Sequence, residues 1–162
     1  LEVHRTWHQM GMRSTCTMLY GHVEEPWHRL DHLIRLRELQ DETGGFTSIV
    51  PYAFEPKNNE LSHLERVKPE EELRMLAITR LMLDNFDHVT AYWISTGLET
   101  AKRALGFGVD DLHGTIFRER IFHMAGAETP QQQTVRALET AIREAGREPR
   151  ERNTYYQLVE SR

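Results

Sequence analysis

The sequence predicts an α/β fold with parallel strands, of the size of half a (β/α) barrel. Short apolar segments without a helical period alternate with segments of 3.6-residue period, which favours strands joined by right-handed helical crossovers. The spacing is close to the roughly 30 residues per unit of a barrel that takes about 250 residues for eight units. We therefore expect four strand–helix units and a C-terminal helix in one partial domain, residues 1–162, with a helical tail from about residue 124.

A small doubly wound sheet is the alternative architecture. It is disfavoured because no glycine-rich phosphate turn follows the first predicted strand.

The first elements are expected to be a helix and a strand. Residues 1–8 have helical character, and Gly11 suits the end of that helix. Residues 14–20 are β-branched and apolar without a helical period, which predicts a buried strand that ends at Gly21. The chain begins at Leu1, inside this first helix, so we expect a piece of a longer protein.

The second unit is marked by proline and glycine. Pro26 suits the first turn of a helix, and Gly44 suits its end. Residues 46–52 predict the second strand. The polar segment 53–68 is expected to be a long loop, and loops of that length in compact domains are usually functional or mobile.

The remaining elements follow the same alternation. Pro69 and the acidic residues after it predict a third helix, because carboxylates stabilise the positive end of a helix. Residues 89–94 predict the third strand, 98–105 a helix and 114–117 a short fourth strand. Thr134 suits the N-cap of the last helix.

Composition excludes several classes of protein. The net charge of −5 argues against a nucleic-acid binder, which needs a basic stripe to displace counterions. No apolar run approaches the roughly 20 residues of a membrane-spanning helix, and no export signal is evident, so we expect a cytoplasmic protein. The single cysteine, Cys16, excludes an internal disulfide and a cysteine-ligated cluster built from this chain alone.

Candidate binding residues follow the predicted strands. In a parallel barrel, functional groups lie where strands end and the following loops begin. These positions mix aromatic and polar side chains, as pockets for organic ligands do, although packing or solvation is the alternative for each. The residues selected are Tyr20, Gly21, His22, Glu24, Tyr52, Phe54, Glu55, Asn58, Trp93, Ser95, Thr96, Phe117, Arg118 and Glu119.

Two histidine pairs and one aspartate pair are further candidates. The pairs His4–His8 and His28–His32 have the i,i+4 spacing of helical zinc ligands, but neither has the adjacent glutamate of a metalloprotease motif, so we expect no metal site. Asp110 and Asp111 are consistent with a shared proton in acid–base chemistry or with a turn in which they bind backbone amides.

Several long stretches resemble one enzyme family. Residues 17–24, 33–46, 80–85, 107–115 and 123–127 are similar to the radical S-adenosylmethionine enzymes of the futalosine route to menaquinone, a group that includes the deazaflavin-cofactor synthases. Within this group, the sequences Ala91-Tyr92-Trp93 and His-Met-Ala-Gly-Ala look most like the aminofutalosine synthases. The dehypoxanthine futalosine cyclases and the deazaflavin-cofactor synthases are the alternatives in the same superfamily.

The resemblance implies a (β/α) barrel of which this chain is the C-terminal half. The family's N-terminal half holds a 4Fe–4S cluster on a Cys-x3-Cys-x2-Cys loop, which one cysteine cannot replace. The complete enzyme is implied to use S-adenosylmethionine and this cluster. An adenosyl radical adds to the enol-ether double bond of a carboxyvinyl-oxy benzoate, and rearrangement with loss of carbon dioxide follows.

The same resemblance implies that the chain is inactive alone. We expect it to pair with the missing N-terminal half-barrel or to self-associate, because half a barrel leaves strand edges without partners. The alternative of another class is a non-catalytic half-barrel that binds a ligand or a partner chain, and whether the chain is part of an enzyme stays open.

The resemblance also assigns roles to residues. Residues 17–24 are similar to the family's GxIxGxxE strand beside the adenosine, with Thr17 in place of the first glycine. Glu55 stands where the family often has His or Gln, and Arg118 where it often has Glu, which alters the field on an anionic substrate. No catalytic or metal-binding residue is assigned. The implied S-adenosylmethionine side is Tyr20, Gly21, His22 and Glu24, and the implied substrate side is Tyr52, Phe54, Asn58, Trp93, Thr115 and Glu119.

Overall fold

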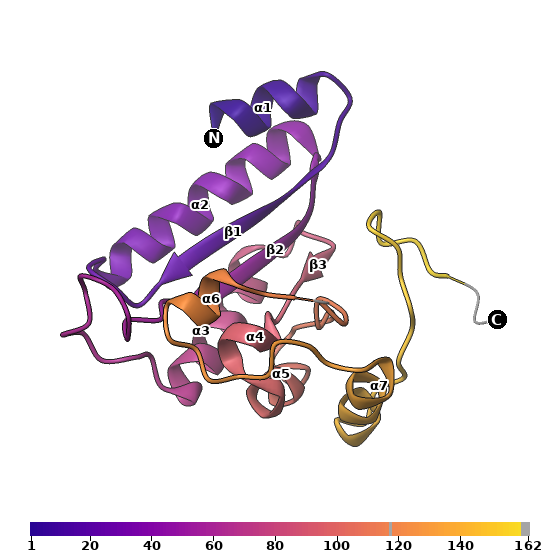
Figure 1. The fold of residues 1–162 in the computed structure, drawn as a ribbon. Coiled ribbons are helices and arrows are strands. Elements are labelled where there is room, and N and C mark those ends of the chain that lie inside the picture. Colours follow the sequence, from indigo (N-terminus) through magenta and orange to yellow (C-terminus); the bar gives the residue numbers. More distant parts are fainter. Residues whose placement is uncertain (117, 160–162) are drawn as a thin grey trace.

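The structure is a computed structural model that describes residues 1–116 and 118–159 (Figure 1). Longer helices alternate with strands at first, and short helices and irregular segments follow. The elements are α1 (Glu2–Gln9), β1 (Ser14–Tyr20), α2 (Pro26–Thr43), β2 (Phe46–Ala53), α3 (Pro69–Met82), β3 (His88–Val89), α4 (Trp93–Thr96), α5 (Leu98–Ala104), α6 (Ile121–Met124) and α7 (Val135–Glu144).

The described strands form one open parallel sheet in the order β1-β2-β3. β1 pairs with β2 along its whole length, for example Cys16 with Ile49, and β2 pairs with the short β3 through Ser48 and His88. Helices α2 and α3 connect the parallel strands, which confirms the predicted α/β class.

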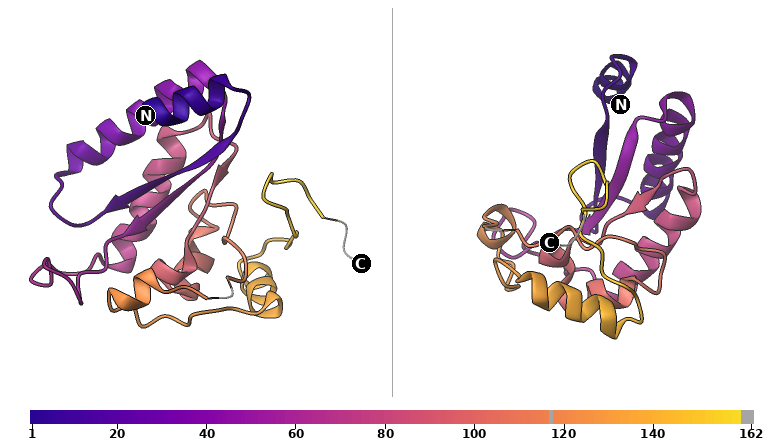
Figure 2. Two further views of the ribbon diagram at one scale, coloured as in Figure 1. Left: turned by 45° about the horizontal axis from the view of Figure 1, so that its top comes forward. Right: turned by 90° about the vertical axis from the view of Figure 1, so that its right-hand side faces the viewer.

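One face of the sheet is covered by helices. In β1 the buried residues are Cys16, Met18 and Tyr20, and α2 and α3 lie along this side of the sheet (Figure 2, right). Leu33 of α2 and Leu76 of α3 belong to the same buried core. Alternation of buried and exposed residues along β1 is typical of a strand with one face in the core.

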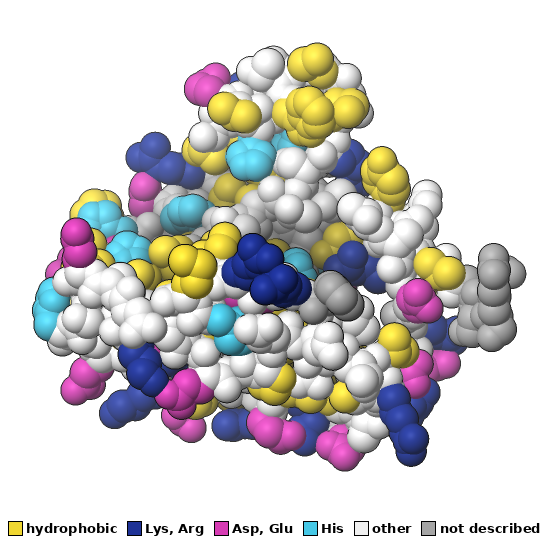
Figure 3. All heavy atoms as spheres, in the orientation of Figure 1, with side chains coloured by type: hydrophobic (Ala, Val, Ile, Leu, Met, Phe, Trp, Pro, Cys, Tyr) yellow, Lys and Arg dark blue, Asp and Glu magenta, His cyan; other side chains and the backbone are white. Residues whose placement is uncertain are grey.

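The opposite face of β1 is open to solvent. Its alternate residues are exposed, and Leu19 keeps 43% of its surface. Figure 3 shows the molecule hollowed over the sheet, below the hydrophobic side chains that gather on and just after α1, where Val3, Trp7 and Met10 are exposed. Paired residues of neighbouring strands point to the same side. We therefore define the open face by the pairs Thr15–Ser48, Thr17–Val50 and Leu19–Tyr52, of which the β1 members are exposed while Ser48 and Val50 are buried.

Helix boundaries follow the local sequence signals. Pro26 begins α2, and Gly44 ends it in the left-handed conformation with φ of 60°. Pro69 begins α3, with acidic residues in its first turn. Thr134 caps α7, because its hydroxyl accepts a hydrogen bond from the Ala137 N–H at 3.1 Å. These predictions are confirmed, as is the long irregular loop before α3.

The third strand is shorter than predicted. It covers only His88–Val89, and Trp93–Thr96 form the helix α4 instead of the end of a strand. All four residues of α4 are buried. A short buried apolar run has no periodicity that separates a strand from a helix, so the sequence pattern alone does not predict α4.

The expected fourth strand does not form over its described residues, 114–116, and Phe117 lies outside the described residues. His113, Gly114 and Ile116 have φ values of 68°, 86° and 39°, which are incompatible with an extended strand. The free edge of the sheet instead gains an isolated parallel bridge between Thr90 and Asp111.

The C-terminal tail is helical only in part. After α6 the chain is irregular up to α7, and the segment beyond α7 runs back towards the β3 edge of the sheet (Figure 1). Arg152 fixes this segment by an ion pair between its Nε and Asp111 Oδ2, at 2.6 Å. None of the described helices has the length and apolar character needed to cross a membrane.

Candidate functional site

The candidate site lies at the carboxyl ends of β1 and β2 and at the chain that follows β3. In parallel α/β folds, ligands bind at this end of the sheet because the connecting loops converge there. Here the loops are residues 21–25, 54–68 and 90–97, with residues 113–129 beside them.

Glu24 holds the turn between β1 and α2. Its carboxylate accepts hydrogen bonds from the N–H groups of Gly21 (2.6 Å) and His22 (2.9 Å) and from Arg29 Nε (2.6 Å). Burial opposes ionisation, but these donors outweigh it and lower the pKa of Glu24 to about 2. Glu24 is therefore an ionised residue whose oxygens already organise the loop.

The same turn requires glycine at position 21. Gly21 has φ of +88°, and a Cβ there would lie 2.1 Å from Cγ2 of Val67 in the long loop. The imidazole of His22 accepts a hydrogen bond from the Val23 N–H at 2.7 Å and lies edge-on to the ring of Phe54. Close approach of the backbone thus joins the first and second loops of the site.

The side chain of Tyr20 points away from the open face. It is buried in the helical layer, and the guanidinium of Arg29 lies 5.4 Å from the centre of its ring. Only the backbone of Tyr20 reaches the rim of the sheet, where its carbonyl accepts a hydrogen bond from the Phe54 N–H at 2.8 Å.

Three aromatic rings meet on the open face. Tyr52, at the end of β2, lies with its ring centre 6.0 Å from that of Tyr92 and 5.6 Å from that of Phe122 of α6. Tyr92 and Phe122 are also 5.6 Å apart. We call these residues the aromatic cluster. The imidazole of His113 lies edge-on to Tyr92 at 5.2 Å.

Trp93 supports this region from within the core. It is fully buried, and its Nε1 donates a hydrogen bond to the carbonyl of Gly114 at 2.8 Å. Period-two alternation puts Tyr92, next to it in sequence, on the open face with Thr90. That alternation was the signal by which the sequence could have identified Tyr92, which is half-buried, as the less buried member of the pair.

Glu119 and Asn58 hold the segment that carries Phe122. Glu119 accepts hydrogen bonds from the N–H groups of Ile121 (2.7 Å) and Phe122 (3.0 Å), which lower its pKa against the effect of burial. Asn58 donates through its backbone to the Ala125 carbonyl at 2.9 Å. Thr115 is exposed. The structure thus brings predicted substrate-side residues to one end of the sheet. Glu119 and Asn58 support the segment that carries Phe122, whereas Thr115 is accessible.

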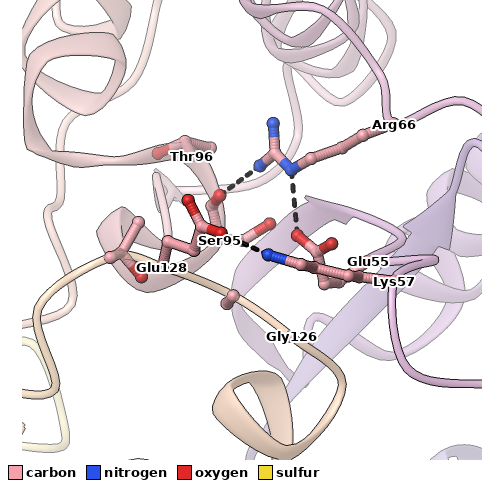
Figure 4. Close-up of a pocket in the computed structure, with 9 residues that line it drawn as sticks. Glu55, Lys57, Arg66, Ser95, Thr96, Gly126 and Glu128 are labelled. Carbon is pink, nitrogen blue, oxygen red and sulfur yellow. Dashed lines mark hydrogen bonds and ion pairs between the residues drawn. The ribbon is translucent and has the colours of Figure 1, made fainter.

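A cavity of about 490 Å³ lies beside this region, outside the sheet (Figure 4). Arg66 reaches into it from the long loop, and its guanidinium binds the carboxylate of Glu55 (3.1 Å) and the carbonyl of Ser95. Lys57 and Glu128 form an ion pair across the cavity, between the long loop and the chain after α6. The cavity is lined by Glu55, Lys57, Arg66, Ser95, Thr96, Gly126, Ala127, Glu128 and Thr129.

Arg66 also contacts a buried carboxylate that the sequence did not single out. Glu72, in the first turn of α3, is fully buried, and Oε1 lies 3.0 Å from Arg66 Nη1. Neither oxygen has a well-aligned hydrogen bond within the part of the chain that the structure describes. Burial raises the pKa of Glu72 to about 7, against the attraction of Arg66.

The histidine pair of α1 has structural partners. His8 Nδ1 bonds to the hydroxyl of Thr43 and His8 Nε2 to that of Ser14, both at 2.8 Å, and His4 bonds to the same Ser14 at 2.9 Å. Over residues 1–116 and 118–159 no group of three or more His, Cys, Asp or Glu side chains is placed to hold a metal ion. Cys16 is buried, and burial raises its pKa, so it does not offer a thiolate.

The adjacent aspartates have separate partners. Asp110 binds Arg80 at 2.9 Å and the Val89 N–H at 2.8 Å. Asp111 binds Arg152 and accepts a hydrogen bond from the His113 N–H at 2.6 Å. The pair therefore shapes the turn, and the alternative in which the two share a proton does not fit this geometry.

Comparison with known proteins identifies relatives over nearly the whole chain. The family described as "CofH/MqnC C-terminal region" matches residues 43–162. An aminodeoxyfutalosine synthase of Thermus thermophilus is 50% identical over 98% of this chain and 44% of its own length. A 5-amino-6-(D-ribitylamino)uracil–L-tyrosine 4-hydroxyphenyl transferase of Methanoculleus marisnigri is 42% identical over 94% of this chain and 42% of its own.

A cyclic dehypoxanthine futalosine synthase of Streptomyces coelicolor is 38% identical over 97% of this chain and 39% of its own length. The chain thus spans less than half the length of each of these relatives.

Proposed function

Because this chain belongs to the family of the CofH/MqnC C-terminal region, we propose that it is the C-terminal half of an aminodeoxyfutalosine synthase-like radical S-adenosylmethionine enzyme of menaquinone biosynthesis. The observation that carries the proposal is the 50% identity to the Thermus thermophilus aminodeoxyfutalosine synthase along 98% of the chain. The proposed complete reaction joins the adenosyl group of S-adenosylmethionine to a carboxyvinyl-oxy benzoate.

In this proposal the chain is one partial domain of a (β/α) barrel, and its partner is the N-terminal half. The exposed Thr15, Thr17 and Leu19 support it, because the inner face of a closed barrel is packed rather than solvated. The exposed apolar residues of α1 are a second feature typical of an interface. A second copy of the chain is the alternative partner.

The residues of this chain do not fit a 4Fe–4S cluster. Such a cluster needs several thiolates, whereas the chain has one cysteine, which is buried between the sheet and its helices. In the proposal the cluster ligands therefore belong to the N-terminal half, and no step of the reaction is assigned to this chain through the cluster.

The proposed adenosine side is the turn after β1. Gly21 and His22 form this turn, and Tyr20 takes part through its backbone because its side chain is buried. Glu24 takes part by holding two N–H groups of the turn in place. A backbone surface fixed in this way is preorganised to bind a nucleoside without reordering.

The proposed substrate side is the aromatic end of the open face. Tyr52 and Phe54 follow β2, and an aromatic surface of this kind suits a benzoate ring. Trp93, Asn58 and Glu119 act as supports, and Thr115 contributes an exposed hydroxyl. Glu55 is engaged by Arg66, which offsets its charge near an anionic substrate.

The proposal is tested by fusing this chain to the N-terminal half of the Thermus thermophilus aminodeoxyfutalosine synthase. We expect the reconstituted chimera to convert S-adenosylmethionine and the carboxyvinyl-oxy benzoate to an adenosylated product, measured by mass spectrometry. The chain alone and the N-terminal half alone are the controls.

The 42% identity to the 4-hydroxyphenyl transferase favours a second candidate function. Product from tyrosine and the ribitylamino-uracil instead of the benzoate would favour that function. A folded, cluster-loaded chimera without any product would favour a non-catalytic binding module.

A further inference from the structure

We propose that His113 contacts the substrate, and that its imidazole donates a hydrogen bond to a carboxylate oxygen of a ligand whose ring lies on the aromatic cluster. This inference rests on the proposed function and deepens it by naming a residue that selects the substrate. It is carried by the backbone conformation of His113, by the position of its ring and by the cavity next to it.

The backbone of His113 has an unfavourable conformation that its neighbours impose. Its φ of 68° lies in the left-handed region, where a side chain with a Cβ is strained. Asp111 accepts a hydrogen bond from the His113 N–H at 2.6 Å, and the buried Trp93 donates to the next carbonyl, that of Gly114, at 2.8 Å. Both sides of the residue are thus fixed by groups anchored in the rest of the protein.

Glycine adopts this conformation without penalty, whereas side chains with a Cβ, including histidine, adopt it uncommonly. Residues kept in such conformations cluster at ligand-binding sites, where the strained geometry aims a side chain. At position 113 the side chain so aimed is an imidazole.

The imidazole is directed at the aromatic cluster and is accessible. It lies edge-on to Tyr92, at 5.2 Å and 80°, and the residue is exposed. Neither ring nitrogen has a hydrogen-bond partner within residues 1–116 and 118–159, whereas the backbone N–H is satisfied by Asp111. A polar ring with unused donor and acceptor positions beside an apolar surface is the arrangement that orients an organic ligand.

The space around His113 is sufficient for a ligand group. His113, Gly114 and Thr115 border a cavity of about 810 Å³ that extends to α7 and the C-terminal segment. The ring centres of Tyr52 and Phe122 lie 6.0 Å and 5.6 Å from that of Tyr92, so these residues extend the apolar surface beside the imidazole. A benzoate ring on these aromatic residues would place its substituent next to the imidazole.

Charge at this position is compatible with an anionic ligand. The Asp111 carboxylate is paired with Arg152 at 2.6 Å, which offsets the negative charge closest to the imidazole. Desolvation lowers the pKa of His113, against the effect of Asp111, so the ring is neutral near pH 7 and carries one N–H donor. That donor matches a carboxylate oxygen.

The test uses the complete polypeptide that contains this chain, with His113→Gly and His113→Asn. Glycine removes the ring but accepts the left-handed backbone, and asparagine keeps both this backbone and a hydrogen-bond donor. His63→Asn is the matched control, because His63 is an exposed histidine in the long loop. Calorimetry measures the Kd for the carboxyvinyl-oxy benzoate, and a thermal melt gives Tm for each variant.

We expect His113→Gly to weaken binding by about tenfold or more, as loss of a hydrogen bond to a charged group does. The Tm of His113→Gly should equal or exceed that of the wild type. The Kd of His113→Asn should lie between the values for the wild type and His113→Gly, and His63→Asn should bind as the wild type does. Unchanged affinity in His113→Gly would overturn this inference and leave the proposed function untouched. A lowered Tm with unchanged affinity would make His113 a packing residue. Wild-type protein that fails to bind the benzoate would overturn the proposed function, and the inference with it.

Discussion

The ring of Tyr156 lies parallel to the imidazole of His88, with 4.0 Å between the ring centres and 11° between the planes. The Tyr156 hydroxyl is 3.2 Å from that of Thr90, which in turn is 2.9 Å from that of Ser48. These contacts link the C-terminal segment to the open face at β3. The guanidinium of Arg152 lies 4.0 Å from the centre of the same ring.

We therefore expect Tyr156→Ala to lower the free energy of unfolding by about 1–3 kcal/mol, the sum of an aromatic pair and a hydrogen bond. Tyr156→Phe keeps the stacked ring and should lose only about 0.5–1.5 kcal/mol. Urea denaturation measures both. Tyr155→Ala is the control, because the neighbouring Tyr155 is 72% exposed. Equal losses in Tyr155→Ala and Tyr156→Ala would contradict the assigned role.

Glu24 gives a prediction with a defined pH dependence. Glu24→Gln removes an ionised acceptor of two backbone N–H groups and of Arg29, and should destabilise the chain by about 1–3 kcal/mol at pH 7. The pKa of Glu24 is lowered from 4.5 to about 2, so its stabilising effect is complete above pH 4.5 and is lost as pH falls towards 2.

Urea denaturation of wild type and Glu24→Gln between pH 7 and pH 2 measures this effect. The difference between the two proteins should shrink as the solution becomes more acidic. Glu38→Gln is the matched control, since Glu38 is an exposed glutamate on α2. A difference that stays constant down to pH 2 would show that the charge of Glu24 does not act through these bonds.

Local signals made much of the fold predictable. Pro26 and Gly44 act on their own backbone, so they place the ends of α2 without knowledge of what α2 packs against. The strand β1 has the same bounds as predicted, because its β-branched, apolar composition persists over the whole segment.

Tertiary contacts decided what the sequence could not show. The left-handed conformation of His113 combines a local hydrogen bond to Asp111, two residues earlier, with a tertiary hydrogen bond from Trp93 to the carbonyl of Gly114. For the same reason the residues after it do not extend as a strand. Arg66 gave no local signal either, because its partners Glu55, earlier in the same loop, and Glu72, in the first turn of α3, stand at no spacing that sequence rules relate.

Arg66 and Glu72 form an ion pair, and we expect that removing only one of the two side chains lowers the stability of the chain. Arg66→Met leaves the buried Glu72 without its cation and should destabilise the chain by about 1–3 kcal/mol, a value moderated by the partial exposure of Arg66. Adding Glu72→Gln should restore part of that loss. Arg74→Met is the control, because Arg74 pairs with Glu71 on the exposed surface of α3.

The contribution of Glu72 to stability should change with pH in the direction opposite to that of Glu24. The pKa of Glu72 is raised from 4.5 to about 7, so the folded state favours the protonated form, and the contribution of Glu72 to stability is lost as pH rises through 7. Between pH 5 and pH 8, Glu72→Gln should remove this part of the pH dependence. An identical pH profile in wild type and Glu72→Gln would contradict the raised pKa.

The open face of β1 should control association of the isolated chain. An unpaired strand edge with exposed apolar residues is a template for another chain, so we expect the wild-type chain to self-associate in sedimentation velocity. Leu19→Lys puts a charge on this face and should shift the population towards monomer. Leu81→Lys is the matched control, because Leu81 is 79% exposed on α3, away from the sheet edge.

Addition of the N-terminal half should replace self-association by a one-to-one complex that Leu19→Lys weakens and Leu81→Lys does not. A stable wild-type monomer with a sharp two-state melt would contradict this account, because it would mean that the chain needs no cover for its open face.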